Sequence, residues 1–68
     1  MRYRPETFAD ITLPYFKMLA KDASYSVKDD IITIVATIAG EEYIDSYAPT
    51  SHEFHLAHER MKARIRGG

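Results

Sequence analysis

The stretch Ile31–Ile38, which reads IITIVATI, decides the fold of this chain. All of its residues except Ala36 are β-branched and none is charged, a composition typical of a strand rather than of a helix. Successive side chains of a strand point to opposite faces of the sheet. The even-numbered residues are all apolar, so we expect them to point into the core: Ile32, Ile34, Ala36 and Ile38. The opposite face then carries Thr33, Val35 and Thr37.

A second run of strand-forming residues follows closely, and the two runs predict a β-hairpin. We expect strands over residues 31–39 and 42–48, joined near Gly40, which tolerates the positive φ that such a turn requires. A three-residue loop would place Ile44 in the core and send Tyr43, Asp45 and Tyr47 outward. A two-residue loop would reverse these positions and bury Asp45, which is costly unless the carboxylate is paired. We therefore expect the three-residue loop.

The flanking segments predict one helix on each side of the sheet. Residues 13–22 carry Pro14 in what would be the first turn, followed by apolar side chains at helical spacing. Residues 51–66 follow Thr50, which forms a capping box with Glu53.

Two shorter segments complete the expected fold. Residues 24–28 alternate in polarity and predict the first strand, and residues 1–12 are expected to form an N-terminal arm. The sequence thus predicts a single α+β domain over residues 1–68, ordered α-β-β-β-α, with a three-stranded antiparallel sheet and both helices packed on one face. The expected core consists of Phe16, Leu19, Ile32, Ile34, Ile38, Ile44, Phe54 and Met61.

Size and composition narrow the class of protein. The chain has 68 residues, a net charge of −1 and no cysteine. A chain of this size buries only about 60% of its unfolded surface, so its stability should be small. Without cysteine it can form neither a disulfide nor a thiolate metal site, which suits a reducing compartment. It contains no apolar run long enough to span a bilayer and no signal peptide, so we expect a cytoplasmic protein.

The sequence offers little support for catalysis, cofactor binding or metal binding. The serines stand in turn or strand contexts, and the chain contains no phosphate-binding glycine loop. His52, His55 and His58 fall in one predicted helix, and two of these imidazoles could share a metal with Glu59. The pattern differs from that of zinc proteases, and we expect no catalytic residue, no cofactor and no tightly bound metal.

The C-terminal helix is rich in cations and raises nucleic-acid binding as an alternative. The order helix, three antiparallel strands, helix over roughly residues 13–65 resembles double-stranded-RNA-binding domains in outline. That resemblance implies a similar fold. Those domains begin their last helix with lysines that contact phosphates, where this chain has Thr50 to Glu53 and no lysine. The candidate phosphate contacts are Arg2, Arg4, Arg60, Lys62, Arg64 and Arg66.

The face of the sheet opposite the helices is the favoured interaction surface. It is expected to be more apolar and aromatic than a solvated face, which is typical of protein interfaces. Its residues, together with an acidic rim, are Thr33, Val35, Thr37, Glu41, Tyr43, Asp45 and Tyr47. We expect a small binding or regulatory module that contacts another protein, such as an inhibitor or adaptor from a phage or mobile element. A homodimer formed through the long strand or the open face is a further alternative.

Overall fold

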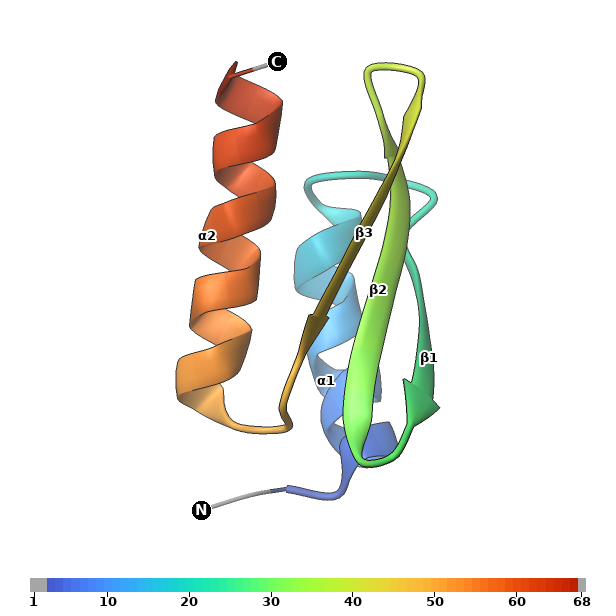
Figure 1. Cartoon of the computed structure of the whole chain (residues 1–68), viewed down its shortest axis with the longest axis vertical. Coiled ribbons are helices and arrows are strands. Elements are labelled where there is room, and N and C mark those ends of the chain that lie inside the picture. Colours follow the sequence, from blue (N-terminus) through green and yellow to red (C-terminus); the bar gives the residue numbers. More distant parts are fainter. Residues whose placement is uncertain (1–2, 68) are drawn as a thin grey trace.

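The computed structural model describes residues 3–67 and has the predicted order of elements. These are α1 (Pro5–Lys17), β1 (Ser24–Lys28), β2 (Ile31–Ile38), β3 (Glu41–Tyr47) and α2 (Ser51–Gly67). The strands form one antiparallel sheet with β2 in the middle, and both helices lie on the same side of it (Figure 1). Helix α1 packs on β1 and β2, whereas α2 packs on β3. The α+β class and the α-β-β-β-α order are confirmed.

The first helix begins earlier than the sequence suggested. It covers Pro5–Lys17, so most of the segment expected to be an N-terminal arm is helical, and residues 18–22 lie beyond the helix end. Pro5 occupies the first turn, where the missing N–H costs nothing. Pro14, which we had placed in the first turn, lies inside the helix. Pro14 has no N–H to donate to the carbonyl group four residues before it. Both residues are exposed, so water can bond to that carbonyl group instead.

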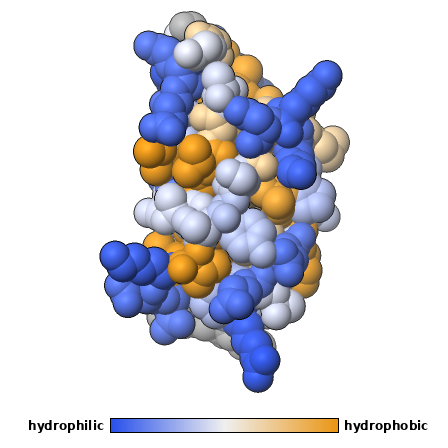
Figure 2. All heavy atoms as spheres, turned by 90° about the vertical axis from the view of Figure 1, so that its right-hand side faces the viewer, coloured by the Kyte–Doolittle hydropathy of each residue, from blue (hydrophilic) through white to orange (hydrophobic). Residues whose placement is uncertain are grey.

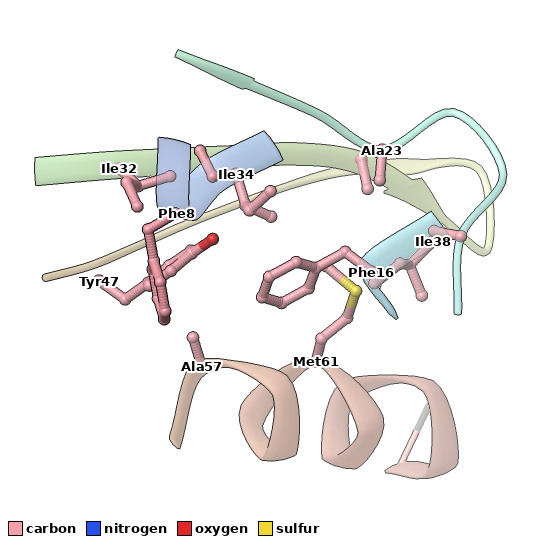
Figure 3. Packing of buried hydrophobic residues seen from close by; sticks show 12 residues of the cluster. Phe8, Phe16, Ala23, Ile32, Ile34, Ile38, Tyr47, Ala57 and Met61 are labelled. Atoms are coloured by element: carbon pink, nitrogen blue, oxygen red, sulfur yellow. The ribbon is translucent and has the colours of Figure 1, made fainter. Parts of the chain in front are cut away.

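The core forms between the even-numbered face of β2 and the two helices (Figure 3). Ile32, Ile34, Ala36 and Ile38 are all buried, which confirms the period-two assignment of this strand. The helices contribute Phe8, Ala9, Phe16, Ala57 and Met61, and Figure 3 shows the Phe16 ring beside the thioether of Met61. Of the other expected core residues, Leu19 and Phe54 are half-buried at its margin, and Ile44 is exposed.

The hairpin between β2 and β3 has a two-residue loop, so the predicted register is wrong by one residue. Ile38 pairs with Glu41 and Val35 with Ile44. The loop residues Ala39 and Gly40 have φ values of 54° and 80°, the signature of a turn whose twist matches that of the strands it joins. The strands accordingly end at Ile38 and begin again at Glu41.

The start of α2 agrees with the sequence. The backbone N–H of Glu53 donates to Oγ1 of Thr50 at 3.2 Å, as expected for a capping residue three positions earlier. The helix continues to Gly67, one residue beyond the predicted end.

Candidate interaction surfaces

The register shift divides the predicted sheet patch between the two faces. Because side chains alternate along β3, Tyr43, Asp45 and Tyr47 point toward the helices rather than outward. Tyr47 takes the core position that we had assigned to Ile44, and only 2% of its surface is exposed. The hydroxyl groups of Tyr47 and Thr12 lie 2.7 Å apart and share a buried hydrogen bond. The expected aromatic outer face therefore does not exist.

The cost that we had attached to Asp45 is avoided because β3 is an edge strand. The carboxylate is only partly buried, and Arg60 of α2 reaches it with an Nε–Oδ2 distance of 2.8 Å. It also accepts hydrogen bonds from the backbone N–H of Ser46 and from the hydroxyl of Tyr43. Burial raises the pKa of Tyr43, and the nearby Asp45 carboxylate raises it further. A charge on the helix side of an edge strand is thus satisfied by the neighbouring helix.

A second ion pair extends this contact between β3 and α2. Glu41, predicted as the acidic rim of a partner site, accepts a hydrogen bond from Arg64 at 2.9 Å. The Nζ atom of Lys62 lies 3.6 Å from Oε1 of Glu59, which belongs to the same helix. These contacts are surface ion pairs of Arg60, Lys62 and Arg64, and the use of these residues as phosphate contacts stays a prediction. Arg4 and Arg66 are exposed, and Arg2 lies outside the described residues.

The outer face of the sheet is formed by a different set of residues from the one predicted. Thr33, Val35 and Thr37 do lie on it, and the register places Ile44 directly beside Val35. The remaining positions on this face are the apolar Ile31 and five polar residues: Ser24, Ser26, Lys28, Glu42 and Ser46. Figure 2 shows the result, in which apolar groups form separate patches divided by weakly polar ones and bordered by hydrophilic groups. The face is mixed rather than continuously apolar.

A group of exposed apolar side chains lies along α1 and at the residue that follows its end, a place that was not among the predicted sites. Ile11, Tyr15 and Met18 follow one another at helical spacing, and their exposed fractions are 59%, 52% and 83%. We call these three residues the α1 stripe. The Tyr15 ring lies 5.8 Å from that of Phe54 on α2, so the stripe runs beside the second helix. The spacing of four and three residues was visible in the sequence, but we had expected Ile11 to lie in an N-terminal arm rather than in this helix.

The histidines do not converge on a common point in the structure. His52 and His55 are exposed, whereas the His58 ring packs against Phe16 and Phe54 at centroid distances of 5.8 and 5.7 Å. Over residues 3–67, no group of three or more His, Cys, Asp or Glu side chains is arranged to hold a metal ion. His58 is therefore part of the aromatic packing between the helices.

One surface cavity of about 310 Å³ lies where the N-terminal segment meets the β1–β2 turn. It is lined by Tyr3, Arg4, Pro5, Asp30 and Pro49. The backbone N–H of Tyr3 donates to the carbonyl of Pro49 at 2.9 Å, which ties the segment before α1 to the loop before α2. Except for Arg4, none of the predicted site residues lines it.

Neither helix, in the part of the chain that the structure describes, is long and apolar enough to cross a membrane. Comparison of the chain with protein-family models, with curated proteins and with solved structures finds no match in any of the three.

Proposed function

We propose that this chain is a non-catalytic regulatory module that binds another protein through the α1 stripe. The observation that supports it is the exposure of three large apolar side chains at helical spacing, Ile11 and Tyr15 of α1 and Met18 directly after its end. Single exposed apolar residues are ordinary, but a contiguous group on a small domain is typical of an interaction site. Its residue types also fit, because tyrosine and methionine are common at interfaces and methionine adapts to different partners.

The proposed partner is an amphipathic helix of another protein. The residues of the α1 stripe are separated by four and then three positions, the spacing that lets one helix pack along another. Phe54 is half-buried beside the stripe and offers an apolar wall on the α2 side. His58 follows Phe54 by four residues and packs its ring against the Phe54 ring, which extends this wall along α2.

The amino-acid composition indicates the compartment in which the module would work. A cysteine-free chain suits a reducing compartment, so we place the module in the cytoplasm. An inhibitor or adaptor, for example of phage or mobile-element origin, is the kind of regulator that such a small binding domain would be. The open sheet face is the competing surface for the same function, because Val35 and the 59%-exposed Ile44 lie side by side there.

Site-specific photo-crosslinking tests the proposal. A photoreactive residue at position 18 or at position 44 would be introduced in the cells from which the protein comes. We expect a defined protein to be captured from position 18 but not from position 44. Its binding to the purified module should then weaken at least tenfold for Tyr15→Lys, since a charge would be buried at the contact.

The matched control is Ile44→Lys, which places the same charge on a sheet residue of similar exposure, 59% against 52% for Tyr15. It should leave both binding and the circular dichroism spectrum unchanged. Capture from position 44 with loss of binding in Ile44→Lys would instead assign the site to the sheet. Capture of no protein from either position would contradict the proposed function.

A further inference from the structure

The two edges of the sheet differ in whether side chains bond to their outward-facing backbone groups. On β3, the N–H of Ser46 donates to the Asp45 carboxylate at 2.8 Å. The carbonyl of the same residue accepts a hydrogen bond from Arg60 at 3.2 Å. Side chains thus occupy backbone groups that another strand would need, which is a common way of protecting a sheet edge. The β3 edge is partly closed.

Among residues 3–67, no side chain or further strand covers the outer edge of β1 in this way. The two-residue turn after β1, Asp29 and Asp30, makes Lys28 and Ile31 a hydrogen-bonded pair. Along an antiparallel ladder, hydrogen-bonded pairs alternate with pairs that are not hydrogen-bonded to each other. Tyr25 and Val27 therefore direct their backbone N–H and C=O groups away from β2. Within residues 3–67, β1 pairs with no strand other than β2. Two consecutive outward-facing positions are available to an added strand.

The core is also incompletely covered along this edge. Tyr25 and Val27 of β1, together with Leu13 of α1, are half-buried side chains packed against the core rather than inside it. An added strand would place alternate side chains over these residues on the helix side of the sheet. The edge thus offers apolar contact as well as hydrogen bonds.

Two carboxylates of α1 lie beside this edge. The Tyr25 hydroxyl donates to Oδ1 of Asp10, and Glu6 stands one helical turn before Asp10 on α1. Both carboxylates raise the pKa of Tyr25, the hydrogen bond to Asp10 being the larger cause. Asp10 and Glu6 are exposed, so a cation from a partner could approach them. A strand that carries lysine or arginine on its helix-facing side would find a complementary charge there.

We propose that the β1 edge accepts an extended basic segment of another protein, which adds to the sheet as a fourth strand. Such strand addition takes its affinity from main-chain hydrogen bonds and its specificity from alternate side chains. The partner would place its cation near Glu6 and Asp10 and an apolar residue near Leu13. This site is separate from the α1 stripe, so either proposal can fail while the other stands.

The test uses a synthetic peptide, acetyl-Thr-Lys-Val-Lys-Thr-Val-Thr-amide, and its counterpart with glutamate in place of lysine. In nuclear magnetic resonance titrations of the whole protein, we expect the lysine peptide to shift the amides of Tyr25 and Val27. We expect the glutamate peptide to bind at least tenfold more weakly. The double variant Glu6→Gln, Asp10→Asn should lose several-fold in affinity for the lysine peptide, and that loss should shrink in high salt because the charges are exposed.

A pair of proline variants separates strand addition from general charge attraction. Val27→Pro removes an outward-facing N–H that β2 does not use, so the fold should persist while peptide binding falls at least tenfold. Ile44→Pro removes an equivalent outward-facing N–H on β3 and should bind the peptide as the parent does. Equal binding of the two peptides, shifts centred elsewhere, pairing of β1 with a second copy of this chain, or no binding would each overturn the proposal.

Discussion

At the scale of single residues, the structure separates two isoleucines that the sequence had grouped together. Ile34 is 1% exposed and Ile44 is 59% exposed. We expect Ile34→Ala to lower the free energy of unfolding by about 2–5 kcal/mol, because it leaves a cavity in the core. Ile44→Ala should change it by less than about 0.5 kcal/mol. Urea denaturation measures both variants, and a similar loss in each would show that the register is wrong.

Tyr47 makes the free energy of unfolding depend on pH in the alkaline range. Burial raises the pKa of Tyr47, and the hydrogen bond with Thr12 opposes only part of that rise. The folded state therefore favours the neutral phenol. The stability this contributes is present in full below the pKa of an exposed tyrosine, about 10, and is lost as pH rises through the higher folded pKa.

Replacing the phenol removes this titration. We expect Tyr47→Phe to cost about 1 kcal/mol at neutral pH, through the lost hydrogen bond to Thr12. The stability difference between parent and variant should then narrow above pH 10. Thermal melts from pH 8 to 11.5 measure it, and a difference that stayed constant over this range would refute the buried assignment of Tyr47.

At the scale of elements, the β2–β3 turn holds an alanine in an unfavourable conformation. Ala39 has a φ of 54°, a left-handed conformation that is rare for residues with a Cβ. Asparagine followed by glycine is the preferred pair for a two-residue turn of this kind. Ala39→Asn should therefore raise the free energy of unfolding by about 0.5–1 kcal/mol. Gly40→Ala should lower it, because φ is 80° there although nothing lies within 4 Å of the added Cβ.

Comparison of the helices and strands with their predicted bounds shows which parts of the fold could be predicted from the sequence. The strand assignment of Ile31–Ile38 and the burial of its even-numbered face could be predicted, because alternation and β-branching act locally. The register of β3 could not, because it depended on whether a carboxylate facing the helices could be satisfied. Arg60, 15 residues further along the chain, supplies that partner. The early start of α1 was missed because Pro14 was taken as a first-turn residue, although the helix accommodates it in its interior.

The candidate site was predicted less well than the fold. Period-two logic placed Thr33, Val35 and Thr37 on the open face correctly, but the register error carried the tyrosines of β3 to that face as well. The α1 stripe was present in the sequence as spacing alone. Only the position of α1 against β1 and β2 shows which side of the helix is buried, and hence that Ile11 points outward.

At the scale of the whole molecule, one core supports surfaces of different character. The helices bury the even-numbered face of β2 and leave the α1 stripe exposed, while the sheet presents a mixed outer face and one uncovered edge. The β3 edge and α2 are joined by ion pairs of Arg60 and Arg64. The proposed binding functions therefore use different sides of a small domain, which is how an adaptor can hold two partners at once.

The oxidation rate of Met18 in the native assembly tests the central claim most directly. Met18 is 83% exposed on the α1 stripe, and Met61 is fully buried, so oxidation of Met61 would report unfolding of the chain during the pulse. Methionine oxidation follows solvent exposure, so a bound helix should shield Met18. We predict that a short peroxide pulse oxidises Met18 readily in the isolated protein and at least fivefold more slowly in its source cells, with Met61 unreactive in both. Equal Met18 oxidation in the isolated protein and in the cells would contradict the assignment of the α1 stripe as the partner site.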